Sequence, residues 1–207
     1  VSGKDSMSMD GTLDTKGGGR ARISAPPTLQ VSAAGKIADI RVCVSMDVKT
    51  PGDLVYVLGT TRNELGGSEF YALHNEIGAH VPEVDIERNI SLYTALSEAM
   101  REGLVRSAHG CYKGGLAVAL AQKAFAGGYG LSIDLDSVPS EENLSVEQLL
   151  YSESSGRFAV TVSPDKKDRF EHLLGKNPYG RVGYVRHDGI LSIFGGRGHD
   201  IVQEDIG

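Results

Sequence analysis

Five consecutive apolar residues, Leu54 to Leu58, constrain the fold of this chain more than any other feature of its sequence. The run follows the turn Pro51-Gly52 and contains no polar residue, which predicts a strand covered on both faces. Helices are therefore expected on both sides of the sheet. The chain has 207 residues, 40% apolar and 23% charged, which is ordinary for a globular protein with a sizeable core.

Hydrophobic periodicity elsewhere in the chain defines the fold class. Alternation predicts strands at residues 28–37, 130–136, 157–162, 180–186 and 190–194. Helical spacing predicts helices at 69–77 (carrying Phe70, Leu73 and Ile77), from a cap at Asn89 to Leu104, at 116–126, at 145–152 and between Ser163 and Gly175. The last two strands flank the turn 187–189 and are expected to form a hairpin. The predicted class is α/β (α+β), a mixed β-sheet with helices packed on it.

Residues 1–27 differ in composition from the rest of the chain. The stretch from Gly11 to Pro27 contains three consecutive glycines and shows no periodicity, so it is predicted to be a mobile loop. Val1 stands directly before a glycine turn, as if the chain continued from a missing upstream domain. We therefore expect a loop segment at 1–27 and one folded domain at 28–207.

Charge and cysteine content argue against several classes of protein. The net charge is −6 and no dense basic stripe appears, which argues against nucleic acid as a partner. No apolar run approaches the length of about 18 residues that a membrane span needs. Cys43 and Cys111 lack metal-binding or redox spacing, so free thiols in a reducing cytoplasm are expected.

Two glycine turns stand before helices, where unpaired backbone N–H groups attract anions. Gly66, Gly67 and Ser68 follow the strand at 54–58, and this layout fits either an anion site or a simple helix cap by Ser68. The pair Gly114-Gly115 opens the small-residue helix at 116–126. For this second turn the residues alone favour a plain turn before a buried helix.

Other candidate sites give weaker signals. His109 lies beside the second glycine turn, where a histidine is more often a hydrogen-bonding residue than a catalyst. Asp134 and Asp136 share one strand face and fit a metal, although a solvated strand face is the commoner case. No Walker loop, GxGxxG, GxSxG or zinc spacing is present.

Four segments together resemble one known family. They are SGKDSMSM at Ser2 to Met9, ELGGSEF at Glu64 to Phe70, SAHGCYKGGLAVALA at Ser107 to Ala121 and SESSGRFAVTV at Ser152 to Val162. In this order they resemble the C-terminal part of phosphoribosylformylglycinamidine synthases, which are members of the aminoimidazole ribonucleotide synthetase superfamily. The resemblance implies a fold like the C-terminal domain of aminoimidazole ribonucleotide synthetase.

The resemblance also implies an activity, that of an ATP-dependent carbon-nitrogen ligase of purine biosynthesis in the cytoplasm. Such enzymes convert formylglycinamide ribonucleotide to its amidine with ATP and glutamine-derived ammonia. ATP and magnesium are expected to bind mainly through the missing upstream ATP-binding domain, and ammonia to come from a glutaminase domain. These two domains, the ribonucleotide substrate and a second copy of the chain are the expected partners.

Particular residues match the family's cleft-lining turns. The resemblance implies nucleotide or substrate binding, without assigning a catalytic residue or a metal ligand, by Gly3, Lys4, Asp5, Ser6, Gly66, Gly67, Ser68, His109, Lys113, Gly114 and Gly115.

One departure from the family pattern separates two hypotheses. The family has His-Asp-x-Ser-Asp-Gly-Gly where this chain reads HGCYKGG at 109–115. Gly110 replaces an aspartate that the resemblance makes a magnesium ligand, and Lys113 brings a positive charge that can meet a phosphate. The chain is then either the cleft half of a ligase, inactive in isolation, or a scaffold domain with a degenerate nucleotide site.

Overall fold

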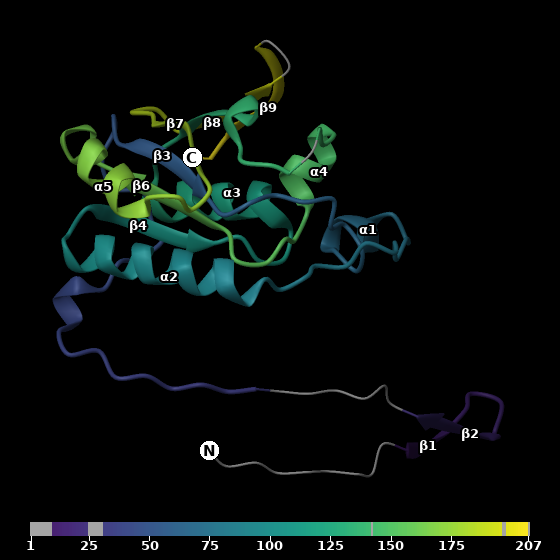
Figure 1. Ribbon diagram of the computed structural model, residues 1–207. Helices are drawn as coiled ribbons and strands as arrows, with labels where there is room; N and C mark the ends of the chain where they lie inside the picture. Colours follow the sequence, from purple (N-terminus) through teal and green to yellow (C-terminus); the bar gives the residue numbers. More distant parts are fainter. Residues whose placement is uncertain (1–9, 25–30, 142, 196–197, 207) are drawn as a thin grey trace. The chain divides into compact units, whose positions relative to one another are not determined.

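The computed structural model describes residues 10–24, 31–141, 143–195 and 198–206 (Figure 1). The chain forms two compact units, Val1–Ala38 and Asp39–Gly207. The expected loop segment at 1–27 and folded domain at 28–207 stay a prediction. The segment SGKDSMSM lies outside the described residues.

The described part of the first unit contains a hairpin. Strand β1 (Asp10–Asp14) pairs antiparallel with β2 (Arg20–Ser24). The backbone N–H of Thr15 donates to the carbonyl of Gly19 at 2.8 Å, and Gly18 has a φ of 79°. Residues 10–24 therefore pair as strands although the sequence showed no periodicity there, because the glycines supply a hairpin turn.

The second unit is built on a seven-stranded mixed sheet. Its strands are β3 (Leu54–Leu58), β4 (Val105–Gly110), β5 (Leu131–Asp134), β6 (Phe158–Val162), β7 (Tyr179–Val185), β8 (Ile190–Gly195) and β9 (His199–Asp205). Their order is β4-β6-β3-β7-β5-β8-β9. Only the pair β5 and β8 is parallel among these strands. The predicted mixed sheet is confirmed.

Helices cover both faces of this sheet (Figure 1). They are α1 (Glu69–Leu73), α2 (Ile86–Arg101), α3 (Gly115–Gly127), α4 (Val146–Tyr151) and α5 (Lys167–Leu174), with short 3-10 turns η1 (Ile40–Val42), η2 (Leu135–Ser137) and η3 (Pro164–Lys166). Val55 and Val57 pack in a core with residues of α3 and α4. Tyr56 and Leu58 enter a second core with α2 and α5. The expected two-sided burial of β3 is confirmed.

Two strand predictions are wrong. No strand forms over the described part of 28–37, where Val31 and Ile37 are 77% and 63% exposed. Strands β7 and β8 do not form a hairpin with each other, because β5 lies between them and β9 pairs with β8. A Cβ atom on Gly183 would lie 1.8 Å from the carbonyl oxygen of Ser132, so the missing side chain permits the close approach of β5. The pairing of β5 with both β7 and β8 thus replaces the hairpin that the turn at 187–189 predicted.

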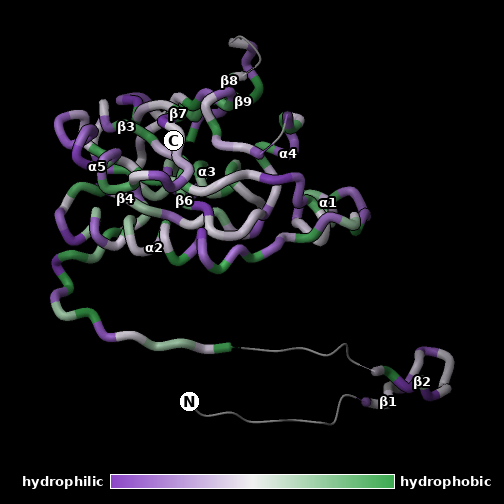
Figure 2. Tube along the Cα trace, in the orientation of Figure 1, coloured by the Kyte–Doolittle hydropathy of each residue, from purple (hydrophilic) through white to green (hydrophobic). Residues whose placement is uncertain are grey.

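The helix boundaries also shift from the expected positions. Asp85, rather than Asn89, caps α2, and its side chain accepts a hydrogen bond from the backbone N–H of Arg88. Hydrophilic and hydrophobic residues alternate along α2 in Figure 2. Helix α1 ends at Leu73, and Ile77 lies beyond it with 78% of its surface exposed. No helix in the described part of the chain combines the length and the apolar character that crossing a membrane requires.

A buried lysine joins α3 to the sheet. The Lys123 ammonium donates to the Ser107 Oγ at 2.6 Å and to the Met46 carbonyl at 3.1 Å. The Ser107 and Thr161 hydroxyls are 2.7 Å apart. No carboxylate forms an ion pair with Lys123 among the described residues, and burial lowers the pKa of its ammonium to about 7. The charged form is therefore disfavoured in the folded chain.

Replacement of Lys123 by methionine is expected to remove a pH dependence of stability. Between the folded pKa of about 7 and the ordinary value of 10.5, the unfolded chain binds a proton that the folded chain lacks. The wild-type free energy of unfolding therefore rises with pH across this window. Lys123→Met should be more stable near neutral pH by about 1 kcal/mol or more, and the difference should shrink towards the alkaline end. Urea unfolding of the wild type and the variant over this pH range measures the difference in stability and its change with pH. A difference that does not change with pH would contradict the lowered pKa of Lys123.

Candidate functional site

Loops from five strands meet at one edge of the large sheet. Strands β3, β4 and β5 end there, and the antiparallel strands β6 and β7 begin there, since Leu58 lies opposite both Phe158 and Tyr179, and Gly110 lies opposite Phe158. Both described glycine turns belong to these loops. Gly3, Lys4, Asp5 and Ser6 lie outside the described residues, so their predicted role remains a prediction.

The first glycine turn packs against a neighbouring loop. The backbone N–H of Gly66 donates to the His80 carbonyl at 2.7 Å, and that of Gly67 to the Ile77 carbonyl at 2.6 Å. A Cβ atom on Gly66 would lie 2.6 Å from the His80 carbonyl oxygen. The glycines therefore allow two backbone segments to meet, and both N–H groups are satisfied within the protein.

Ser68 acts as the cap of α1. Its backbone N–H donates to the Leu65 carbonyl at 3.1 Å, and its hydroxyl donates to the same carbonyl at 2.6 Å. The hydroxyl also accepts from the backbone N–H of Tyr71 at 3.2 Å, and Ser68 is only 1% exposed. Of the two alternatives for this turn, the structure contains the helix cap.

The second glycine turn begins α3. Gly114 caps the helix with a φ of 78°, and Gly115 follows with a φ of 64°. A Cβ atom on Gly115 would lie 2.7 Å from the carbonyl oxygens of Leu150 and Ser152. Glycine is needed here both for the left-handed backbone and for the close packing of α3 against the end of α4.

His109 and Tyr112 form a small polar and aromatic cluster beside this turn. The His109 Nε2 lies 2.7 Å from the Gln122 Oε1, and the His109 ring stands edge-on to the Tyr112 ring at 5.9 Å. A Cβ atom on Gly110 would lie 2.3 Å from the Tyr112 ring, so the glycine leaves room for the tyrosine. His109 is a hydrogen-bonding residue in this arrangement, and Tyr112 is 66% exposed.

Glu153 joins the two glycine turns. Its Oε1 accepts from the backbone N–H of Glu69 at 2.9 Å and from that of Gly114 at 2.8 Å. The Lys113 ammonium donates to the Glu69 carboxylate at 2.7 Å, which raises the pKa of Lys113. The anion between the turns is therefore one of the protein's own carboxylates. The sequence analysis missed Glu153, although the residue lies in one of the four family-like segments.

Arg157 is a second site residue that the sequence analysis missed. The side chain is only 2% exposed and donates to the Thr61 hydroxyl at 2.8 Å and to the Ser154 carbonyl at 3.3 Å. It also donates to the Ser152 carbonyl. Burial lowers the pKa of the guanidinium, and these three hydrogen-bond acceptors are neutral oxygens. Arg157 therefore fixes the loops before β6 and after β3 in one arrangement. Like Glu153, it lies in the family-like segment 152–162, which did not indicate its role.

An open groove of about 580 Å³ runs beside the second turn. Tyr93, Tyr112 and Phe158 give it aromatic walls, and Lys113 and Glu153 contribute charge to its lining. The Lys113 side chain is 82% exposed and so is accessible to a ligand. The groove combines ring faces for a planar group with an ammonium for an anion.

The described residues contain no cluster of metal-binding side chains. Within residues 10–24, 31–141, 143–195 and 198–206, no group of three His, Cys, Asp or Glu side chains is arranged to hold a metal. Asp134, one of the two strand aspartates considered for a metal, accepts from the Asp136 backbone N–H and from the Ser137 hydroxyl. Gly110 offers no side-chain ligand.

Removal of the Glu153 carboxyl is expected to loosen both turns. Glu153→Ala leaves the N–H groups of Glu69 and Gly114 without an acceptor, so their amide hydrogen exchange should accelerate. Glu153→Gln keeps a side-chain carbonyl oxygen and should retain most of the protection. Amide exchange followed by NMR in the two variants tests this, and equal protection in Glu153→Ala and wild type would contradict the bridge.

Comparisons with known proteins agree with this architecture. The model of the family "AIR synthase related protein, C-terminal domain" matches residues 50–196. A phosphoribosylformylglycinamidine synthase subunit PurL of Thermococcus sibiricus is 33% identical over 180 residues, 87% of this chain and 24% of the relative. The chain thus spans about a quarter of this relative.

Solved structures of PurL from Thermotoga maritima have the same fold. One, complexed with FGAR, superposes with a TM-score of 0.73 at 22% identity and covers 81% of this chain and 29% of that chain. Another, complexed with ATP, gives a TM-score of 0.65 at 23% identity and covers 81% and 27%. The resemblance to phosphoribosylformylglycinamidine synthases is confirmed, and the chain belongs to the family of AIR synthase related protein C-terminal domains.

Proposed function

We propose that this chain forms one wall of the nucleotide or substrate cleft of a phosphoribosylformylglycinamidine synthase. In the proposed reaction the γ-phosphoryl group of ATP is transferred to the amide oxygen of formylglycinamide ribonucleotide, and ADP is the leaving group. Ammonia then adds to the carbon, and phosphate departs to give the amidine. The residues described here would bind and orient ligands, and none is assigned to the bond-making steps.

The observation that carries this proposal is the meeting of the two family-like turns at one sheet edge, beside an open groove. Glu153 ties the turn at 66–68 to the turn at 109–115, and the groove lies directly along the second turn. Its volume of about 580 Å³ is within the usual range for sites that bind small molecules. The exposed Tyr112 and Lys113 suit the base and the phosphates of a nucleotide.

The rest of the catalytic machinery would come from outside the described residues. PurL relatives are about four times longer than the matched part, and one of their solved structures is a complex with ATP. We infer that an ATP-binding domain, a glutaminase and magnesium would complete the cleft. The nucleotide- or substrate-binding role of Gly3 to Ser6 is part of the same proposal. A cytoplasmic location and self-association of the chain belong to the same proposal.

A scaffold role is the second candidate, and specific contacts favour it. The N–H groups of Gly66, Gly67 and Gly114 already have acceptors within the protein. Gly110 and Lys113 stand where the family pattern has aspartates, and the described residues hold no metal cluster. In this alternative the same fold would pack against other domains without binding a nucleotide.

Titration of the folded chain with ADP is expected to separate these candidates. If the groove binds the nucleotide, Lys113→Ala and Tyr112→Ala should each weaken binding by about tenfold, because a charge-assisted hydrogen bond or a stacked ring is lost. Lys167→Ala is the matched control, since Lys167 is also an ion-paired surface lysine but lies on α5. Isothermal calorimetry gives the affinities. No binding by the folded wild type would favour the scaffold.

The isolated chain is expected to show no turnover. Formylglycinamide ribonucleotide, ATP, magnesium and ammonium would be supplied together, and ADP and amidine measured. The reason is that the described residues provide no metal cluster, on which stabilisation of a transferring phosphoryl group normally relies. Amidine formation above the protein-free background would contradict this expectation.

A further inference from the structure

The outer side of α2 carries an apolar row that is exposed to solvent. The helix buries its inner side in the core that it shares with α5. Ile86, Ile90 and Tyr93 lie on the outer side and are 66%, 60% and 44% exposed. Their spacing of four and three residues places them in one row, which we call the α2 stripe. A helix with apolar residues on both sides is typically covered on both sides, so the α2 stripe is expected to meet a partner.

A second row, of polar side chains, flanks the α2 stripe. Glu87, Thr94 and Arg101 follow one another at intervals of seven residues, which places them close to one line along the helix. Glu87 and Arg101 are each seven residues from Thr94, a distance of about 10 Å along the helix axis. Opposite charges therefore stand at equal distances on the two sides of Thr94.

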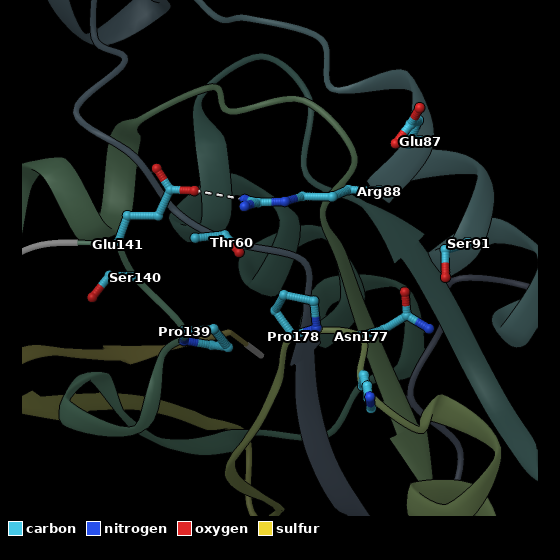
Figure 3. Close-up of a pocket in the computed structure, with 10 residues that line it drawn as sticks. Thr60, Glu87, Arg88, Ser91, Pro139, Ser140, Glu141, Asn177 and Pro178 are labelled. Atoms are coloured by element: carbon cyan, nitrogen blue, oxygen red, sulfur yellow. Dashed lines mark hydrogen bonds and ion pairs between the residues drawn. The ribbon is translucent and has the colours of Figure 1, made fainter.

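Both of these charged groups are accessible to a partner. Glu87 lines a second cavity, of about 680 Å³, beside Arg88, whose guanidinium extends to the Glu141 carboxylate at 2.8 Å (Figure 3). Glu87 itself forms no ion pair within the part of the chain that the structure describes. Arg101 is 60% exposed and pairs with Glu98 of its own helix. Because such an exposed pair contributes little to stability, Arg101 can meet another carboxylate.

The order of these groups along α2 selects the partner. If a second copy of α2 packs antiparallel on the first, a two-fold axis at Thr94 brings Glu87 of each copy opposite Arg101 of the other. The two α2 stripes then cover each other along the seam of the helix pair. A parallel pair would place like charges opposite each other, which is unfavourable. We propose that the α2 stripe is the contact surface of a two-fold symmetric dimer of this chain, with its two α2 helices antiparallel.

This dimer deepens the proposed function, because it rests on the self-association included there and names its surface. It does not depend on nucleotide binding, since Ile86 and Ile90 do not line the groove beside the second glycine turn. Tyr93 belongs to both surfaces, and its ring stands edge-on to that of Phe158 at 5.5 Å. The second copy would therefore border the groove without filling it.

Replacement of Ile90 by aspartate is expected to weaken the dimer. Sedimentation velocity of the 207-residue chain without nucleotide, over a range of concentrations, gives the association constant. The wild type should dimerise, and Ile90→Asp should weaken association by at least about tenfold, because it places a charge in the apolar seam. Phe125→Asp is the matched control, since Phe125 is 62% exposed but lies on α3, which covers the other face of the sheet. It should leave association unchanged.

Charge reversal tests the antiparallel geometry. Glu87→Arg and Arg101→Glu should each weaken association by about fivefold, because both charge pairs become repulsive, and the double variant should recover it. Affinity-tagged Glu87→Arg should retain untagged Arg101→Glu better than untagged Glu87→Arg, since every pair in the mixed dimer is attractive. Circular dichroism verifies that each variant keeps its helices.

Several outcomes would overturn the dimer. They are a wild type that stays monomeric, equal weakening by Ile90→Asp and Phe125→Asp, and a double charge variant as weak as the single ones. A monomeric wild type would leave the α2 stripe to a different protein. Because no nucleotide is present in these measurements, their result is independent of the ADP titration of the groove.

Discussion

The burial of β3 on both faces is the constraint on which the rest of the structure depends. The strand lies between β6 and β7, and its successive side chains enter two different cores. One core requires α3 and α4, and the other requires α2 and α5. Since helices close both faces of the sheet, the loops at the strand ends become the natural place for binding groups. Both cavities described above lie among these loops.

Sequence reasoning succeeded where the signal was local. The apolar run at 54–58 and the glycine pair before α3 each depend on a few neighbouring residues, and both predictions are confirmed. For Ser68 the sequence left a helix cap and an anion site open, and the structure contains the cap. Sequence reasoning failed where pairing was decided at long range. The turn at 187–189 resembles a hairpin turn, yet β5 separates the two strands, because Gly183 admits its backbone. Residues 28–37 alternate in hydrophobicity as a strand would, yet the described part of this segment pairs with no strand.

The candidate site shows the same limit in finer detail. The glycine pattern located two places where N–H groups gather, but it did not reveal what would accept their hydrogen bonds. The acceptor shared by Glu69 and Gly114 is Glu153, which is 84 residues from Glu69 in the chain. The role of Arg157 likewise could not be recognised from the sequence, since its hydrogen-bond acceptors are two backbone carbonyls and a hydroxyl. The family resemblance gave the segments, and only the fold gave the contacts between them.

The contact between Gly110 and Tyr112 links two departures from the family pattern. The tyrosine ring occupies the space that a side chain at position 110 would need. An aspartate at this position would therefore have to push the ring outwards into the groove, where it would change the ligand-binding surface. A side chain at position 110 would therefore change the aromatic surface that Tyr112 now presents to the groove.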